Sequence, residues 1–256
     1  MSWLTITARD NPQLQRLRKL AQDGSAYRKL EAVWLEGDHL MRAALERGCQ
    51  PALALITDVA ARDEALRALA QAAPKVLVVT PDLFKTISGL ESPAQLGFEL
   101  RLPDRPALDP QADSVVLDRL QDAGNVGTIL RSAAAMGFRQ VLALKGTAAL
   151  WSPKVLRAGM GAHFGLRLIE GLSVDELAAL RVPLLATSSH ADALLHQAAL
   201  PAPCAWVMGH EGQGVSEALM ARCALRVGIP QPGGEESLNV ASAASICLYE
   251  SARRRL

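Results

Sequence analysis

Two polar side chains suited to ligand contact, Asn125 and Arg131, lie in the segment 118–138, which follows the apolar run SVVLD. Asn125 is predicted to cap a helix, and Ile129 and Ala133 recur on one face of that helix. Arg131 falls outside this apolar face, one to two turns into the helix, where its guanidinium could reach a ligand. A surface arginine on an ordinary amphipathic helix explains the same pattern.

A second segment, GHEGQGVS at 209–216, places three glycines in six positions after the apolar run CAWVM. Such glycines let backbone amides approach a ligand closely. Their order, G-x-x-G-x-G, differs from the dinucleotide fingerprint G-x-G-x-x-G, and the chain has no Walker A loop. A nucleotide-dependent oxidoreductase is therefore a disfavoured alternative. Beside Glu211, His210 has no strong claim to be a general base.

A third segment, PQPGGEESLNVASAASICLYE at 230–250, follows the apolar run ALRVGI. Its prolines and glycines force an irregular loop. Ser237 is predicted to cap a long helix whose first turn holds Asn239, and the residues at 241–245 are all small enough for close packing. Ser237 and Asn239 are either site residues or plain helix caps.

The elements that must position these segments alternate between strands and helices. Continuous apolar runs predict strands of a parallel sheet covered on both faces, and ligands bind at the carboxyl ends of such strands. The second half of the chain is predicted to form strands at 114–118, 140–144, 183–187, 204–208 and 224–229. Helices are expected near 125–136, 153–160, 174–180, 215–221 and 237–253.

The first part of the chain predicts a smaller α/β layer fold. Strands are expected at 32–36, 52–57 and 76–80, and helices at 13–22, 37–47, 62–72 and from Pro81 onward. The stretch RLPDRPALDPQAD at 101–113 carries three prolines and five charges, as a linker does. We therefore expect an N-terminal domain at 1–105, a linker at 106–112 and a second domain at 113–256.

Composition narrows the setting in which the chain works. The net charge is +1 and no apolar run approaches the roughly 20 residues that a membrane helix needs. The first residues lack the basic-then-apolar order of a signal peptide. Four widely spaced cysteines, without a C-x-x-C pair, predict reduced core residues in the cytoplasm, and neither a metal site nor disulfides.

The leading segment 1–29 is locally basic, with six cations against two anions. Such a segment is suited to phosphate contacts, and we expect these from five of its side chains: Arg16, Arg18, Lys19, Arg28 and Lys29. A solvated amphipathic helix face explains the same charges.

Taken together, NVGTILRSAAAMGF (125–138), VMGHEGQGVS (207–216) and IPQPGGEESLNVASAASICLYE (229–250) resemble the SpoU/TrmH family of RNA 2′-O-ribose methyltransferases, in the SPOUT superfamily. The match covers about 113–256. The run VWLEGDHLMRAAL (33–45) resembles the start of the family's small α/β substrate-binding domain.

The resemblance implies a SPOUT-type parallel sheet whose C-terminal segment forms a trefoil knot, binding of S-adenosylmethionine, and a homodimer. It implies 2′-O-methylation of a structured RNA, ribosomal RNA being favoured over transfer RNA by the two-domain layout. The cofactor-contacting positions it implies are Gly209, Ile229 and Leu238. The polar active-site positions it implies are Asn125, Arg131, Glu211, Ser237 and Asn239.

The proton acceptor for the 2′-hydroxyl stays open at this point. The resemblance points to Arg131, which is either activated as a base by RNA phosphate or stabilises charge and position; the second is favoured because arginine is a poor base. The sequence departs from the family at Gln231 and Glu235–Glu236, where apolar or small residues are more usual, and at Gly159, where a serine is more usual. A non-catalytic RNA-binding protein on the same scaffold is the alternative function.

Overall fold

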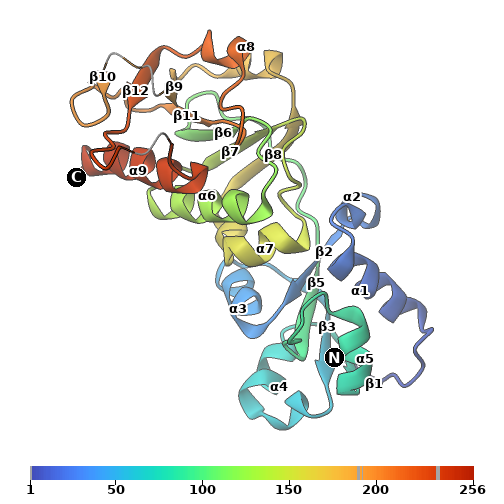
Figure 1. The fold of residues 1–256 in the computed structure, drawn as a ribbon. Helices are drawn as coiled ribbons and strands as arrows, with labels where there is room; N and C mark the ends of the chain where they lie inside the picture. Colours follow the sequence, from blue (N-terminus) through green and yellow to red (C-terminus); the bar gives the residue numbers. More distant parts are fainter. Residues whose placement is uncertain (1, 189–190, 192, 235–236) are drawn as a thin grey trace. The chain divides into compact units, whose positions relative to one another are not determined.

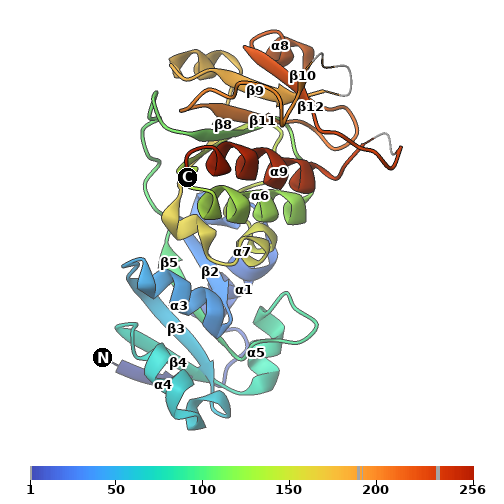
Figure 2. The same cartoon turned by 90° about the vertical axis from the view of Figure 1, so that its left-hand side faces the viewer.

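The computed structural model describes residues 2–188, 191, 193–234 and 237–256, and Figures 1 and 2 show its elements. The chain forms two compact units. The first comprises Met1–Asp104 and Trp151–Phe164, and the second comprises Arg105–Leu150 and Gly165–Leu256. The sequence-based division at 106–112 had grouped residues 151–164 with the second half of the chain.

The first unit is built on a five-stranded mixed sheet in the order β1-β4-β3-β5-β2. Its strands are β1 (Ser2–Thr5), β2 (Ala32–Glu36), β3 (Pro51–Thr57), β4 (Lys75–Val79) and β5 (Leu96–Arg101). Strands β1, β4 and β3 run parallel, and β5 is antiparallel to β3 and β2. The strands β1 and β5 were not predicted, because β1 is short and largely exposed and β5 interrupts its apolar residues with Gly97 and Glu99.

Helices cover both faces of this sheet: α1 (Pro12–Gln22) and α5 (Pro81–Ile87) lie on one side and α3 (Asp38–Glu46) and α4 (Glu64–Ala70) on the other (Figure 1). A short helix, α2 (Ala26–Leu30), follows α1. The predicted helix at 62–72 is split into a 3₁₀ turn, Ala60–Arg62, and α4.

Residues 151–164 pack inside the first unit through α7 (Pro153–Gly159), which contacts β2 and α1. His163 is only 1% exposed, and its ring centroid lies 5.2 Å from that of Trp151. A Cβ on Gly159 would stand 2.5 Å from Cε1 of His163. The departure from serine at this position therefore has a steric reason in this chain, because the His163 ring fills the space.

The second unit is built on a parallel sheet of seven strands in its described residues, which confirms the predicted parallel sheet. The strand order is β10-β12-β9-β11-β6-β7-β8. The strands are β6 (Ser114–Leu117), β7 (Gln140–Leu144), β8 (Arg167–Leu172), β9 (Leu184–Thr187), β10 (Ala193–Leu194), β11 (Ala205–Met208) and β12 (Leu225–Gly228). Two of them were not predicted: β8 carries Arg167 and Glu170, and β10 has two residues.

The two faces of this sheet are covered differently. Helices α6 (Ala123–Ala135) and α9 (Val240–Arg253) lie side by side on one face (Figure 2), where Ser132 Oγ and Ser245 Oγ are 2.8 Å apart. The 3₁₀ turn Asp175–Ala179 and α8 (Glu217–Met220) cover the other face through Leu177 and Leu219. The trefoil knot implied by the resemblance stays a prediction.

The helix caps differ from those predicted. Asp122, not Asn125, caps α6, because Asp122 Oδ1 accepts the Asn125 N–H at 2.7 Å. Asn239, not Ser237, caps α9, since its Oδ1 accepts the N–H groups of Ala241 and Ser242 at 2.9 and 3.2 Å. Both predictions were wrong by a few residues, and the shift leaves the Asn125 carboxamide available for other partners.

The end of α9 is anchored to the start of the sheet. Arg255 donates to both carboxylate oxygens of Asp113, at 2.5 and 2.8 Å, and its Cζ lies 5.6 Å from the Phe138 ring centroid. Arg254 donates to the carbonyls of Leu195 and Ala198. None of the described helices has the length and apolar character required to cross a membrane.

Candidate active site

A cavity of about 1130 Å³ opens at the carboxyl ends of β9, β11 and β12. Parallel sheets bind their ligands at this edge. The cavity is lined by residues that follow the three strands and by the start of α9: Thr187, Ser188, Ala191, Leu194, Gly209, His210, Glu211, Gly212, Gly214, Val215, Gly228, Ile229, Pro230, Gln231, Ser237, Leu238, Asn239, Val240 and Ala243.

The predicted cofactor-contacting positions, Gly209, Ile229 and Leu238, come together in this cavity. Leu238 is 39% exposed, so an apolar side chain is presented to the opening. Ser237 also lines the cavity, and Glu235 and Glu236 lie outside the described residues.

Gly209 is a position where the fold requires the absence of a side chain. A Cβ there would lie 2.2 Å from the backbone carbon of Gly214 and 2.2 Å from the backbone nitrogen of Val215. The loop doubles back on itself through two bonds, from the His210 N–H to the Gly214 carbonyl at 3.0 Å and from the Gly214 N–H to the His210 carbonyl at 2.8 Å. Glycine at 209 therefore allows the loop to close beside the cavity.

Three of the predicted polar residues form a hydrogen-bonded chain across three segments. Asn239 Nδ2 donates to Asn125 Oδ1 at 2.9 Å, and Asn125 Nδ2 donates to Glu211 Oε1 at 3.2 Å. Because Asn125 accepts from one partner and donates to the other, the orientation of its carboxamide is determined. The starts of α6 and α9 are thereby joined to the glycine-rich loop.

The carboxylate of Glu211 also receives two backbone N–H groups from the loop after β6. Gln121 N–H donates to Oε2 at 3.1 Å and Asp122 N–H donates to Oε1 at 3.0 Å. Burial acts to raise the pKa of Glu211, but the hydrogen bonds from Asp122, Gln121 and Asn125 outweigh it and lower the pKa to about 2. Glu211 is therefore ionised at neutral pH and a weak proton acceptor.

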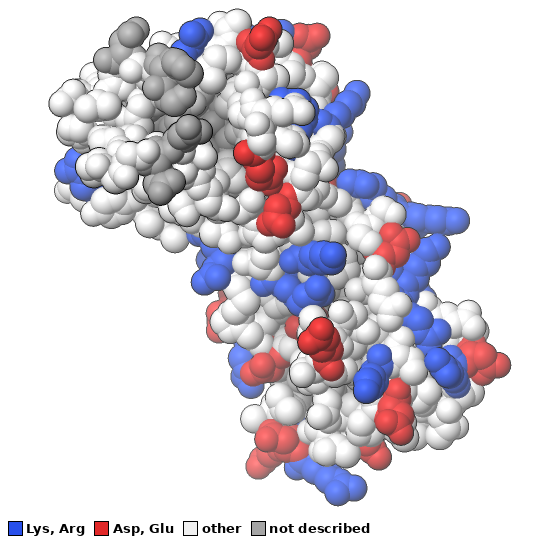
Figure 3. All heavy atoms as spheres, viewed as in Figure 1, with Lys and Arg blue, Asp and Glu red and all other residues white. Residues whose placement is uncertain are grey.

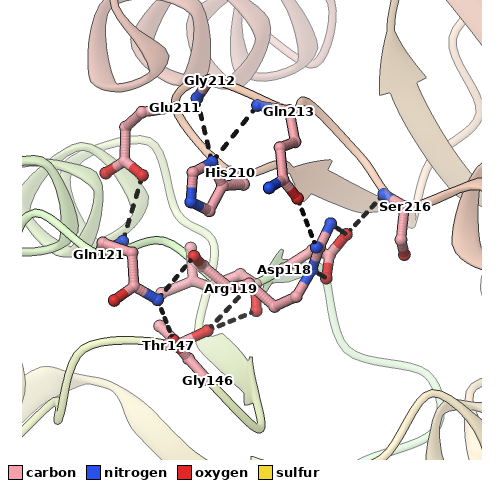
Figure 4. Close-up of polar contacts among 11 residues, drawn as sticks. Asp118, Arg119, Gln121, Gly146, Thr147, His210, Glu211, Gly212, Gln213 and Ser216 are labelled. Carbon is pink, nitrogen blue, oxygen red and sulfur yellow. Dashed lines mark hydrogen bonds and ion pairs between the residues drawn. The ribbon is translucent and has the colours of Figure 1, made fainter.

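A second carboxylate makes the reverse connection between the same two loops (Figure 4). Asp118, 2% exposed at the end of β6, accepts the Ser216 N–H at 2.7 Å. Burial acts to raise the pKa of Asp118, but the hydrogen bonds from Arg119 and Ser216 hold it below its ordinary value. Each loop thus supplies a carboxylate to the backbone amides of the other, which fixes their relative position.

Side chains around Asp118 complete this network (Figure 4). Arg119 donates to Asp118 Oδ1 at 2.9 Å and to Gln213 Oε1 at 2.9 Å. The backbone N–H of Arg119 donates to Thr147 Oγ1 at 3.1 Å. The Thr147 hydroxyl in turn donates to the Leu117 carbonyl at 3.0 Å. Sequence reasoning missed Asp118, Arg119 and Gln213, although their positions directly after β6 and between the loop glycines were a usable signal.

The imidazole of His210 supports the glycine-rich loop. Its Nδ1 accepts the N–H groups of Gly212 and Gln213, at 3.0 and 3.3 Å. A ring nitrogen that accepts hydrogen bonds is unprotonated, so the neutral ring carries its proton on Nε2. A proton added to Nδ1 would break both hydrogen bonds, which argues against His210 as the general base.

Arg131 is exposed on α6 and does not line the cavity. Among the described residues, its guanidinium has no hydrogen-bond or ion-pair partner. The structure therefore brings Asn125, Glu211 and Asn239 together with the cavity-lining residues, whereas Arg131 is exposed on α6 outside this group. Its catalytic role stays a prediction.

The five predicted phosphate-binding cations of the first unit fall into two groups. Arg16 donates to Glu99 and the Leu30 carbonyl, both at 2.9 Å, and Arg18 donates to the Thr86 carbonyl at 2.8 Å. Lys19, Arg28 and Lys29 are exposed, with Arg28 lying 4.9 Å from the Tyr27 ring centroid. On the face in Figure 3, basic and acidic side chains are interspersed. Arg16 and Arg18 thus have structural partners already.

A parallel α/β sheet with a glycine-lined cavity at its carboxyl edge defines a class of enzymes that bind nucleotide-like ligands. Residues 113–249 match the SpoU rRNA Methylase family, and the chain belongs to this family. A tRNA/rRNA methyltransferase of Synechocystis sp., itself uncharacterized, is 32% identical over 267 residues, 98% of this chain and 94% of the relative.

Two further relatives describe the class more closely. The 23S rRNA (guanosine(2553)-2′-O)-methyltransferase RlmP of Bacillus subtilis is 29% identical over 225 residues, 86% of this chain and 88% of that protein. The SpoU methyltransferase AviRb from Streptomyces viridochromogenes, in complex with S-adenosylmethionine, aligns with a TM-score of 0.86 at 25% identity, covering 96% of this chain and 98% of the other. The predicted class, an RNA 2′-O-ribose methyltransferase that uses S-adenosylmethionine, is confirmed.

Replacing Gly209 with alanine is expected to weaken the binding of S-adenosylhomocysteine by about tenfold or more, because the new Cβ forces residues 214–215 away from the cavity. Isothermal titration calorimetry measures this. The matched control is Gly233→Ala, at a glycine that does not line the cavity and where a Cβ would meet nothing within 4 Å. Equal affinities for the two variants would contradict the steric argument.

The lowered pKa of Glu211 predicts a pH-dependent contribution to stability. The carboxylate stabilises the folded state above its ordinary pKa of 4.5, and this contribution is lost as the pH falls towards about 2. Thermal unfolding between pH 2.5 and 7 should show a stability difference between the wild type and Glu211→Gln that shrinks with acid. Glu217→Gln, an exposed glutamate on α8, is the control. A difference independent of pH would disprove the assignment.

Proposed function

We propose that this methyltransferase transfers a methyl group from S-adenosylmethionine to a ribose 2′-hydroxyl in ribosomal RNA. The observation that carries the proposal is the cavity lined by Glu211 and Asn239, which hydrogen bonds connect through Asn125. Relatives named as 23S rRNA 2′-O-methyltransferases support ribosomal RNA as the substrate class. The particular nucleotide differs among those relatives.

The cavity fits the methyl donor in size and chemistry. Its volume of about 1130 Å³ accommodates a nucleoside with an amino-acid chain, since ligand pockets commonly span about 300–1,000 Å³. Ile229 and Leu238 offer apolar contact to an adenine ring, and the closed loop at Gly209 offers backbone groups. When bound, S-adenosylmethionine supplies an electrophilic methyl group on a sulfonium.

The residues of the chain mainly position the substrate. Good positioning lowers a barrier by roughly 7–11 kcal/mol, which is a large share of what this reaction needs. The carboxamides of Asn125 and Asn239 are oriented by their mutual hydrogen bond and by Glu211. Each retains donor capacity for a ribose hydroxyl. Glu211 holds this arrangement as an anion and does not take the hydroxyl proton.

Arg131 is the candidate for contact with the RNA. An exposed guanidinium without a partner among the described residues is suited to a phosphate or to the charge that develops on the 2′-oxygen. Ser237, exposed at the cavity, is a second polar group that can contact the substrate. We favour an electrostatic and positioning role for Arg131 over a role as base.

Exposed side chains and free thiols support our proposals for the assembly and the location of the protein. On α9, Ile246 and Tyr249 are 40% and 53% exposed, one turn apart, and an apolar face of this kind supports the proposed homodimer. All four cysteines are free thiols, which supports a cytoplasmic location. Residues 1–105 are proposed as the RNA substrate-binding domain and 106–112 as the linker to a methyltransferase domain at 113–256, into which α7 and its neighbours at 151–164 are inserted as a segment that packs with the first unit.

Changing Arg131 to alanine is expected to lower methyl transfer by roughly 10²–10³-fold while leaving S-adenosylhomocysteine affinity within about twofold, because the side chain lies outside the cavity. The assay uses radiolabelled S-adenosylmethionine and ribosomal RNA from a strain lacking the gene, followed by mapping of 2′-O-methyl sites. Arg139→Ala, another exposed arginine of the same unit, is the control.

Two outcomes would count against this assignment. Loss of cofactor binding in Arg131→Ala would show that the arginine supports the cavity. No methyl transfer by the wild type, with RNA binding intact, would replace the proposed function with that of a non-catalytic RNA-binding protein.

Neutralising Lys19 and Lys29 together is expected to weaken RNA binding and to flatten its salt dependence, by a slope of roughly 0.7–0.9 for each RNA phosphate that a lysine had neutralised. Arg16 and Arg18 are poorer test positions because their side chains donate hydrogen bonds to Glu99 and Thr86, so replacing them would also disturb the folded structure. Filter binding across a salt series measures the slope, with the exposed Lys85→Gln as control. An unchanged slope in the double variant would rule out these lysines as phosphate ligands.

A further inference from the structure

A second, smaller cavity of about 360 Å³ lies at the carboxyl ends of β7 and β8, beside the network of Figure 4. Val215 lines the first cavity and the next residue, Ser216, lines the second. The glycine-rich loop therefore separates the two cavities. Nothing in the proposed chemistry of the first cavity uses the second.

The floor of the second cavity is apolar. Leu144 and Leu172 are 4% and 3% exposed and end their strands there, and Val174 and Ala218 complete the apolar lining. An apolar surface of this kind packs against the face of a planar ring. It offers little to a free phosphate or a metal ion.

The rim of the same cavity is cationic. Lys145 is exposed, and its ammonium makes no hydrogen bond or ion pair with the residues that the structure describes. Its backbone is held by the bond from the Lys145 N–H to the Leu172 carbonyl at 2.9 Å. The position of Lys145 at the rim is therefore fixed while its charge is available.

The neighbouring carboxylates do not cancel this charge. The negative charge of Asp118 is paired with Arg119, and its carboxylate also accepts the Ser216 N–H. Glu176 accepts the N–H and O–H of Ser173, at 2.8 and 2.9 Å, and lies near Arg105 as well as Lys145. Both carboxylates already have hydrogen-bond partners, and Glu176 does not line the cavity, so the ammonium of Lys145 is available to an anionic ligand.

We propose that this second cavity binds one unstacked nucleotide of the substrate RNA, with its base on the apolar floor and its phosphate at Lys145. Sequence-specific RNA recognition mostly uses single-stranded bases that are splayed out of their stack. An apolar floor beside one available cation matches the two parts of a nucleotide. The proposal rests on the proposed function, because it places a second nucleotide of the same RNA beside the methyl-transfer cavity.

Two variants test the phosphate and the base separately. Lys145→Gln removes the cation, and Ala218→Phe fills the cavity from an exposed position of α8. Their matched controls are Lys85→Gln, an exposed lysine of the first unit, and Ala221→Phe, an exposed alanine that follows α8 and does not line the cavity. Thermal unfolding and S-adenosylhomocysteine affinity of all four variants are expected to match the wild type.

Filter binding uses ribosomal RNA from a strain lacking the gene, with S-adenosylhomocysteine filling the first cavity. Both test variants should weaken RNA binding by about fivefold to tenfold, and Lys145→Gln should lower the salt slope by about 0.7, as expected for one single-strand phosphate. In the methylation assay the KM for RNA should rise by a similar factor. Lys85→Gln and Ala221→Phe should leave affinity, slope and KM unchanged.

If Lys145→Gln and Ala218→Phe bind RNA with the affinity and salt slope of their controls while the wild type methylates ribosomal RNA, this proposal fails alone. If the wild type transfers no methyl group but both test variants still weaken RNA binding, the proposed function fails and the nucleotide site stands.

Discussion

The parallel pairing of β6 with β11 is the constraint on which the site depends. Met208 lies opposite Leu117 at the ends of these strands, so the chain segments that follow them are neighbours. Asp118 from one segment accepts the Ser216 N–H of the other, and Glu211 accepts the N–H groups of Gln121 and Asp122 in return. If the buried carboxylate of Asp118 lacked such donors, the folded state would be destabilised by about 1–3 kcal/mol or more. This cost favours the observed arrangement of the two loops.

That arrangement of the two loops determines the geometry of the site. Once Glu211 is held by the loop after β6, the Asn125 carboxamide can donate to it and accept from Asn239. The caps of α6 and α9 contribute to the same end, because Asp122 and Asn239 satisfy the helix N–H groups through their side chains. Asn125 is thereby left to join two helices and a loop instead of capping one helix.

The same loops also separate two cavities of different character. The first is larger and mixes apolar residues with the polar chain, and the second combines an apolar floor with Lys145. A methyltransferase acting on RNA must hold both a nucleotide-like cofactor and a nucleic acid, and our two proposals assign the cofactor to the first cavity and a nucleotide of the RNA to the second.

Local sequence patterns by themselves determined five strands of the large sheet, the helices between them and the positions of the three glycine-bearing segments, because periodicity and turn chemistry depend on adjacent residues. Only the tertiary structure decided which caps operate, that residues 151–164 join the first unit, and that Arg119 meets Gln213 across 94 positions. Such pairings follow from strand order, which no local pattern encodes. The edge strand β8 and the two-residue β10 were not predicted. Pairing with β7 and β12 stabilises them more than the strand propensity of their own residues does.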